Sequence, residues 1–496
     1  MARLPPGLAP RAAISALACC FVACAAQAPF QRPAPVESAG YAVAPAPVPA
    51  PAPAVSLGAG PPPRWWTAYQ SGALDALVEQ ALRDNRGLRA SSATLRRSEQ
   101  RVLAMLGRTR PRADVSARAE REEVNLSAFG FDPAAFGFSG GNPQFNLYTL
   151  GGGVAYDLDF SGRHRRGLEQ VEAEAEAQLR QTEAAHLTIA GRVVLQVFAI
   201  AALRDRSATM RALLDEDRRN LALTESRHRA GAGTLVEVLS ARGQLASDEA
   251  VLPELEQQLA QARDLLAVLL GVSPAAIGAT DYSLAQFSLP AEVPVLLPAA
   301  LARQRPDILQ AEAELHAASA ALGVATAGLY PEVTLGADFS QAAPQAGELF
   351  SSRFRSFDIF AKLSAPLFRG GALRAAQRGA AAEAQAAAAR YEQTVLEAFA
   401  QVSDLLAALG NDARGLQAQQ RATEVAAESL RLSRRSFEVG NSDVLQVLDA
   451  SRGYQRARLA LVDAQARQFA DLARLQLATA GSWMPAAAAD PATQVR

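Results

Sequence analysis

The 496-residue chain contains only three cysteines, Cys19, Cys20 and Cys24. No disulfide framework and no thiolate metal site can therefore form beyond residue 24. No apolar run reaches the roughly 18 residues that a transmembrane helix needs, so any insertion into a membrane has to use strands. The formal net charge is −1, and no global excess of basic residues favours nucleic acid as a partner.

Histidine is scarce as well, with four residues, and its placement argues against an enzyme. Glu183-Ala-Ala-His186 and Glu225-Ser-Arg-His228 have the Glu-x-x-His spacing of di-iron helical bundles. Both lie on one predicted helix, about 63 Å apart at 1.5 Å per residue, so solvated helix faces are the better interpretation. No paired carboxylates and no nucleophile–base arrangement stand out. We predict no catalytic residue, no metal ligand and no cofactor.

The N-terminus has the form of a secretory signal. Arg3 and Arg11 precede an apolar stretch over residues 12–23, which is short for a membrane span. Phe21-Val-Ala-Cys24 resembles the lipobox of bacterial lipoproteins, which ends in an acylated cysteine, and Ala16-Leu-Ala-Cys19 is a competing match. We expect acylation of Cys24; acylation of Cys19 and an unlipidated chain are the alternatives.

A proline-rich segment follows this N-terminal region. Residues 33–63 hold ten prolines, mostly alternating with alanine or valine. Such a composition predicts an extended tether without a core. We expect order to begin near Trp65.

The remaining chain repeats its parts in the same order. Arg229–Ala241 and Glu438–Ala450 match at a constant offset, with Gly231, Val238 and Leu239 corresponding to Gly440, Val447 and Leu448. Upstream, Phe160-Ser-Gly162 matches Phe368-Arg-Gly370. The sequence is therefore a tandem duplication, and such a repeat determines the architecture.

Each copy contains two segments in which apolar and polar residues alternate, with one exception at Phe360. Alternation of this kind predicts strands long enough to cross a bilayer when tilted. Four strands leave open edges and cannot close into a barrel alone. Two chains would give eight strands and a filled lumen, and three would give twelve and a pore; a soluble sheet with one wet face is the alternative. The predicted strands are 112–124, 145–159, 332–341 and 355–367.

Long helical segments follow each strand pair. Their apolar residues recur in heptad steps with a second seam beside the first, which favours a helix packed between two neighbours. We therefore predict a cylinder of helices. The basic run Arg163-His-Arg-Arg166 at the first strand-to-helix junction fits either lipid headgroups or a solvated turn. The predicted helices are 74–105 with a break at 85–87, 166–229, 235–270 with a bend at Pro253, 373–439 and 444–478.

These parts resemble the outer-membrane efflux family typified by TolC, and more closely its lipoprotein (NodT-type) subgroup serving resistance–nodulation–division pumps. Arg305-Pro-Asp-Ile308 with Ala311-Glu312 is the most specific short match. Trp65-Trp-Thr-Ala-Tyr69, Tyr156-Asp-Leu-Asp-Phe160 and Pro366-Leu-Phe368 also match. The resemblance extends from about residue 24 to residue 483, over the whole architecture.

The resemblance implies a mainly α fold with a membrane β-barrel, built as a homotrimer with a 12-stranded barrel on a periplasmic α-helical barrel. It implies a passive exit duct of a tripartite efflux pump in the bacterial outer membrane. The implied partners are a periplasmic adaptor (membrane fusion) protein, an inner-membrane resistance–nodulation–division pump and outer-membrane lipids, without nucleic acid. A trimeric lipoprotein scaffold or adhesin without a conducting pore is the alternative.

The resemblance also assigns roles to the two glycine turns. It places them at periplasmic tips that meet the adaptor, and it implies that a ring of Asp449 side chains helps to close the tunnel. At two further gating positions this chain carries Gln446 and Ser442 instead of the family's aspartate and arginine, so the closing network is thinner. The implied adaptor-contacting residues are Gly231, Thr234, Val238, Leu239, Gly440, Val444, Val447 and Leu448.

We expect the following division of the chain. A signal peptide covers 1–23, and a lipid anchor with a Pro-rich tether covers 24–63. The first outer-membrane efflux repeat covers 64–290 and the second covers 291–484. A disordered tail covers 485–496.

Overall fold

A computed structural model of the chain describes residues 30–33, 40–41, 53–132, 135, 137, 142–277 and 281–480. Cys19, Cys24 and the predicted tail lie outside the described residues. The chain divides into two compact units, which we treat separately. The sheet unit contains Arg96–Glu176, Ala313–Ala389 and the described residues before Pro33; the helical unit contains the described parts of Pro33–Leu95, Ala177–Glu312 and Arg390–Arg496.

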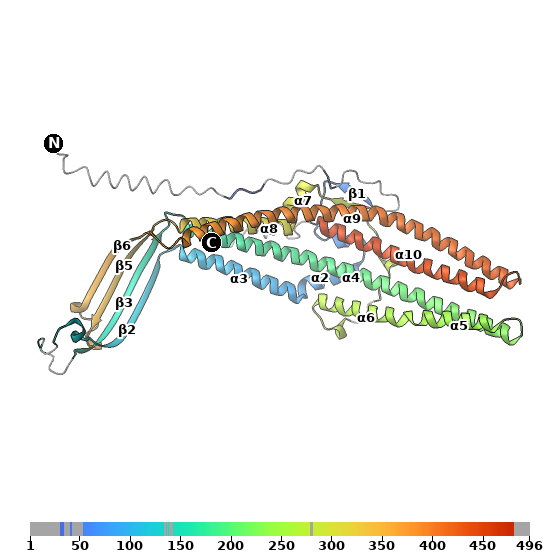
Figure 1. Cartoon of the computed structure of the whole chain (residues 1–496), viewed down its shortest axis with the longest axis horizontal. Coiled ribbons are helices and arrows are strands. Elements are labelled where there is room, and N and C mark those ends of the chain that lie inside the picture. Colours follow the sequence, from blue (N-terminus) through green and yellow to red (C-terminus); the bar gives the residue numbers. More distant parts are fainter. Residues whose placement is uncertain are drawn as a thin grey trace. The chain divides into compact units, whose positions relative to one another are not determined.

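A four-stranded antiparallel sheet dominates the sheet unit, in the order β2-β3-β5-β6 (Figure 1). All four predicted strands are confirmed, with ends shifted by at most three residues. The strands β2 and β6 form the edges of the sheet. The strands are β2 (Arg112–Glu123), β3 (Gln144–Leu158), β5 (Glu332–Ala343) and β6 (Arg355–Ser364).

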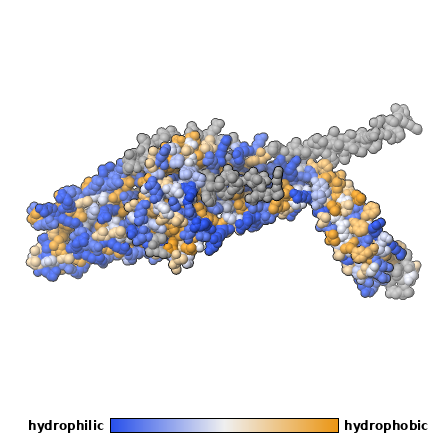
Figure 2. Space-filling model, turned by 180° about the vertical axis from the view of Figure 1, so that it is seen from behind, coloured by the Kyte–Doolittle hydropathy of each residue, from blue (hydrophilic) through white to orange (hydrophobic). Residues whose placement is uncertain are grey.

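The register brings the apolar positions of all four strands onto one face. In one row, Ala113 lies opposite Val154, which lies opposite Ala337, which lies opposite Ile359. Hydrophobic side chains gather over the strands on the molecular surface (Figure 2), and Ile359 is largely exposed. A continuous exposed apolar surface of this kind is typical of a face that contacts lipid or protein.

The polar face accommodates the one residue that breaks the alternation. Phe360 lies on this face opposite Gly336, where an added Cβ would collide with the phenyl ring. Gly153 plays the same part for Asp338 in the next row, because a Cβ there would collide with the carboxylate. The glycines of these strands therefore make room for large neighbours on the polar face.

The long helices confirm the prediction from periodicity. Asn85 separates α2 from α3, and its side chain accepts a hydrogen bond from the N–H of Leu88 at 3.1 Å. The bend predicted at Pro253 lies at Ala250 instead. Helix α6 restarts before the proline, so that the proline falls in the first turn, where its missing N–H is tolerated. The helices are α2 (Gly72–Asp84), α3 (Arg86–Arg108), α4 (Arg163–Arg229), α5 (Leu235–Glu249), α6 (Val251–Leu270), α7 (Pro298–Gln304), α8 (Pro306–Ala327), α9 (Ala372–Glu438) and α10 (Val444–Thr479).

The expectation that no apolar run reaches the length of a transmembrane helix was wrong. Helix α4 contains an 18-residue window with a mean hydropathy of 1.7, apolar enough by composition to cross a membrane. However, 56% of that window is buried, and Val193, Val197 and Ile200 of α4 belong to the core of the helical unit. Packing among helices explains the apolar composition of this helix.

The expectation that order begins near Trp65 was also wrong. Strand β1 (Ala54–Leu57) pairs in parallel with β4 (Glu292–Val295), and the Tyr41 hydroxyl donates a hydrogen bond to the carbonyl of Leu296 at 2.7 Å. Residues 54–60 lack proline, so their N–H groups are available for strand pairing. The last part of the proline-rich segment therefore belongs to the helical unit.

Candidate functional site at the hairpin tips

Two helical hairpins of the helical unit end in the same turn. Gly231 follows α4 with φ +75°, and Gly440 follows α9 with φ +79°, in the left-handed region that favours glycine. In each turn the glycine N–H donates to the carbonyl three residues back, and the next N–H donates to the carbonyl five residues back. This is the Schellman arrangement, which satisfies the last carbonyls of a helix.

The second helix of each hairpin begins with a side-chain cap at equivalent positions of the two copies. Thr234 accepts a hydrogen bond from the N–H of Glu237 at 3.3 Å, and Glu237 accepts one from the N–H of Thr234 in return. Asp443 accepts a hydrogen bond from the N–H of Gln446 at 3.0 Å. Both caps satisfy the free N–H groups of a helix start, so Thr234 has a structural role in addition to its predicted contact.

The apolar side chains of the two tips differ in exposure. In the first hairpin, Leu235 and Leu239 are 56% and 54% exposed. The equivalent Val444 and Leu448 of the second hairpin are each 3% exposed. The first tip therefore presents an apolar surface, to which the exposed Val236 also contributes, whereas the second tip exposes Val439 and Leu445 instead.

One difference between the copies lies beside Val444. Phe437 packs with Leu430, Val444 and Val447 in a small core of the second hairpin, and the Arg227 guanidinium from α4 lies 4.4 Å from the centre of its ring. The position equivalent to Phe437 in the first copy is occupied by His228, whose Nδ1 is 3.0 Å from the carbonyl oxygen of Gly233. The first tip therefore lacks the phenyl ring that packs on Val444 and Val447 in the second tip.

The predicted contact residues are therefore divided. Gly231, Thr234, Leu239 and Gly440 are exposed, whereas the side chains of Val238, Val444, Val447 and Leu448 are buried in the hairpins. Sequence comparison of the copies treated these positions as equals. It also missed Leu235 and Val236, although the exchange of phenylalanine for histidine between the copies was a visible signal.

The three predicted gate residues lie at the second tip. Asp449 and Gln446 are exposed on α10, one helical turn apart. Ser442 is half-buried in the turn. A ring of carboxylates needs further copies of the chain, so the gate remains a prediction.

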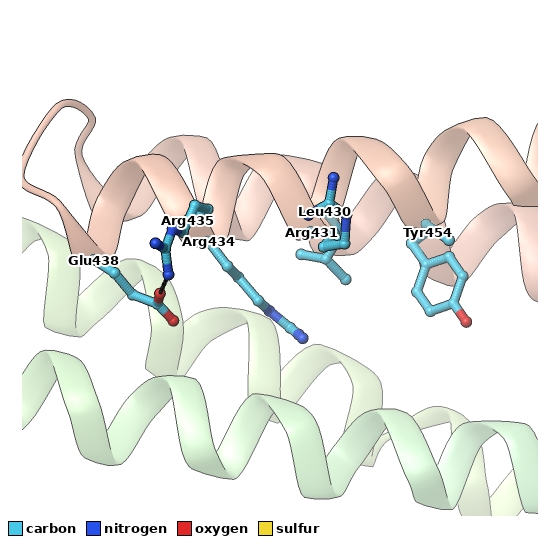
Figure 3. Close-up of a pocket in the computed structure, with 7 residues that line it drawn as sticks. Leu430, Arg431, Arg434, Arg435, Glu438 and Tyr454 are labelled. Atoms are coloured by element: carbon cyan, nitrogen blue, oxygen red, sulfur yellow. Dashed lines mark ion pairs between the residues drawn. The ribbon is translucent and has the colours of Figure 1, made fainter.

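A cavity of about 390 Å³ lies beside the second tip. Figure 3 shows its lining side chains on α9 and α10, with Arg434 extending toward the neighbouring hairpin, where it forms an ion pair with Glu216 of α4. Arg435 pairs with Glu438 at 3.8 Å. The cavity is thus rich in guanidinium groups that are already paired with carboxylates.

A buried polar network joins the two hairpins above the tips. Asp217 of α4 is 2% exposed, and both of its carboxylate oxygens lie 3.3 Å from Nε2 of Gln455 on α10, which donates to them. Burial raises the pKa of Asp217 to about 7, and the neighbouring carboxyl of Asp248 on α5 adds to the rise. Gln244 donates to Asp248 at 2.6 Å and accepts from Arg452 of α10.

A second acidic pair lies between the helices of the second hairpin. Burial and the nearby Asp471 of α10 raise the pKa of Asp412 on α9 to about 6, against the opposing charges of Arg467 and Arg474. Arg474 also donates to Asp471 at 2.6 Å. Each hairpin therefore holds a pair of carboxyl groups of which one keeps its proton toward neutral pH.

The two Glu-x-x-His pairs have local partners. Glu183 forms an ion pair with Arg180 at 3.1 Å, and Glu225 forms one with Arg242 at 2.8 Å. Within the part of the chain that the structure describes, no three His, Cys, Asp or Glu side chains gather in a metal-binding arrangement.

This architecture is similar to that of known outer-membrane proteins. The profile of the family described as outer membrane efflux protein matches residues 77–272 and 296–481. The chain is 29% identical over 425 residues to the pyoverdine export outer membrane protein OpmQ of Pseudomonas aeruginosa, covering 85% of this chain and 87% of that protein. It is 26% identical to the probable outer membrane lipoprotein SilC of Salmonella typhimurium, covering 85% and 88%.

The solved structure of the outer-membrane channel OprN superposes with a TM-score of 0.78 at 28% identity, covering 90% of this chain and all of that one. The expected TolC-like fold and outer-membrane location are thereby confirmed, as is the function of an efflux channel. Since the profile matches most of both repeats, the chain belongs to the outer membrane efflux protein family.

Proposed function

We propose that three copies of this chain form the passive exit duct of a tripartite efflux pump. The observation that carries the proposal is the four-stranded sheet. Its apolar face is exposed and its edges, β2 and β6, are open for pairing with other copies. Open edges are not stable in lipid, because each unpaired N–H and C=O group there costs several kcal/mol.

The polar face of the sheet supports a lumen rather than a filled core. One row across the strands consists of Ser116, Gly151, Ser340 and Ser356. Small polar side chains of this kind leave space for water. Twelve strands give a barrel wide enough for an aqueous path, whereas eight are filled by side chains, so the trimer is the assembly that suits a duct.

The division of the chain into a signal peptide, an acylated anchor at Cys24 and two repeats is part of the same proposal. Phe30 supports a docked anchor segment, because its ring stacks on His316 of α8 with ring centres 4.3 Å apart. His316 in turn lies 3.0 Å from the carboxylate of Glu169 on α4. The anchor segment would then be held against the sheet unit before the chain continues into β1.

The adaptor surface is proposed to lie chiefly on the first tip, where Leu235, Val236 and Leu239 are exposed. An inner-membrane pump would supply the energy, since nothing in the family's role as a duct requires catalysis by this chain.

Burying one leucine contributes about 1.5–3 kcal/mol, so Leu235→Ser with Leu239→Ser should weaken binding of a purified adaptor at least tenfold. Val425→Ser, at an exposed apolar position of α9, serves as the matched control; equal losses in both variants would contradict the placement.

Single-channel recording tests the function itself. Purified full-length chain added to a planar lipid bilayer should produce discrete conductance steps that persist in the absence of adaptor and pump. Insertion without conductance would favour the alternative of a scaffold or adhesin.

A further inference from the structure

The segment between β6 and α9 carries the most exposed large apolar side chains of the described residues. Leu367 is 95% exposed and Phe368 is 89% exposed. Leu367 is also in step with Leu363 of β6, which belongs to the apolar face of the sheet. Two exposed apolar side chains therefore follow the apolar strand β6, which ends at Ser364.

This apolar pair is followed by positive charge. From Ile359 to Ala382 the chain carries Lys362, Arg369, Arg374 and Arg378 and no carboxylate. The three arginines are exposed, and no ion pair involves any of them among the described residues. Arg374 and Arg378 are four residues apart on α9 and so share one face of the helix.

At the equivalent junction of the first copy, charged side chains have partners within the same unit. Asp159, which corresponds to Leu367, accepts hydrogen bonds from the N–H groups of His164 and Arg165 at 3.0 and 2.8 Å. Arg163 forms an ion pair with Glu332 of β5. The second junction has exchanged its capping carboxylate for an exposed leucine, and its cations face solvent.

We propose that residues 365–378 form a phospholipid-binding surface in the membrane leaflet that adjoins α9. Acyl chains would cover Leu367 and Phe368, and Arg369, Arg374 and Arg378 would bind the phosphate of an anionic headgroup. Three features favour lipid as the occupant: the surface directly follows a strand with an exposed apolar face, it ends in cations, and it lies between the last strand and a long helix. Aromatic residues and arginines in this order are typical of a membrane–water interface.

The proposal rests on the proposed function in one respect, namely that the sheet spans the outer membrane. Native mass spectrometry of the full-length chain, purified in detergent with equimolar phosphatidylglycerol and phosphatidylcholine, tests it directly. The wild type should retain phosphatidylglycerol preferentially. The triple variant R369Q/R374Q/R378Q should lose that preference, since each cation near an anionic surface changes binding by about fivefold.

Two controls separate the contributions. R96Q/R97Q/R101Q removes three exposed arginines from α3 in the same unit and should keep the wild-type preference. L367S/F368S should reduce retention of both lipids, because it removes acyl contact rather than charge. Retained preference in the R369Q/R374Q/R378Q variant, or equal loss in the α3 variant, would overturn the proposal.

Two other occupants give different results. If L367S/F368S lowers the yield of trimer and leaves lipid retention unchanged, the surface is an interface between copies and the proposal fails. If free inorganic phosphate displaces phosphatidylglycerol completely, the site binds soluble anions and the proposal also fails. Conductance in planar bilayers is recorded in parallel, so that a chain that retains lipid but does not conduct would contradict the proposed function alone.

Discussion

The buried carboxyl group of Asp217 should make the helical hairpins less stable as the pH rises. Burial raises the pKa of Asp217 from its usual value of 3.8 to about 7 in the folded chain. Between these two values the folded chain binds more protons than the unfolded chain. The free energy of unfolding therefore falls as the pH rises through that range and levels off above about pH 7.

The size of the effect follows from the shift. One pKa unit corresponds to about 1.4 kcal/mol, so the rise of the pKa of Asp217 from 3.8 to about 7 corresponds to at most about 4 kcal/mol. Between pH 5 and pH 7 the loss should be roughly 2 kcal/mol. Asp217→Asn keeps the shape of the side chain and an acceptor for Gln455, and it removes the titrating group.

Thermal unfolding of the purified chain in detergent, recorded by tryptophan fluorescence at several pH values, measures the difference. Asp217→Asn should be more stable than the wild type at pH 7, and the gap in Tm should narrow steadily toward pH 4. Asp215→Asn is the matched control, because Asp215 is an exposed neighbour paired with Arg218 at 3.1 Å. Wild-type and Asp217→Asn curves that run parallel across the pH range would refute the reasoning.

Three further predictions concern the membrane and the gate. Ile359→Arg on the apolar face should cost about 2–4 kcal/mol and reduce assembled trimer in membranes, whereas Ser340→Arg on the polar face should not; equal losses would contradict the assigned faces. Cys24→Ser should remove the acyl mass from the mature N-terminal peptide in mass spectrometry while the trimer still inserts, and an acyl group that persists on Cys19 would sink the assignment. Asp449→Ala should raise resting conductance and weaken block by multivalent cations, because three carboxylates around one axis attract cations; unchanged recordings would leave Asp449 an ordinary solvated residue.

The regular elements were predictable because their signals are local. Strict alternation in Val333-Thr-Leu-Gly-Ala-Asp-Phe339 identifies a strand wherever one face is apolar and the other polar. A stretch from Arg166 to Arg229 without proline, with heptad apolar steps, can hardly form anything but a helix. These signals need no knowledge of the partner element.

Features that depend on distant partners were not predictable. Strands β1 and β4 have four residues each and lie more than two hundred positions apart in the sequence, so neither carries enough periodicity to be recognised alone. Helix α8 was also missed, because alanine and other apolar residues lie all around it and leave no amphipathic pattern.

The buried network shows the same limit for polar residues. In the sequence, Asp217 and Gln455 look like ordinary polar residues on the solvated faces of their helices. Only packing of α4 against α10 reveals that both are buried and bonded to each other. A polar residue on a helix surface gives no local sign of which neighbour will cover it, and the rise in pKa at Asp217 is a consequence of that cover.

Comparison of the two copies predicted the backbone of the turns correctly but not the exposure of the side chains beside them. Gly231 and Gly440 keep identical turns, because a left-handed φ penalises every residue with a Cβ. The side chains beside those turns carry no such penalty and differ between the copies. His228 stands instead of Phe437 beside the first turn, where Leu235 and Leu239 are exposed and their counterparts Val444 and Leu448 are buried. Where Leu367 stands instead of Asp159, a helix cap becomes an exposed apolar contact. Functional differences between the copies therefore lie at positions where the backbone is the same and the side chain is not.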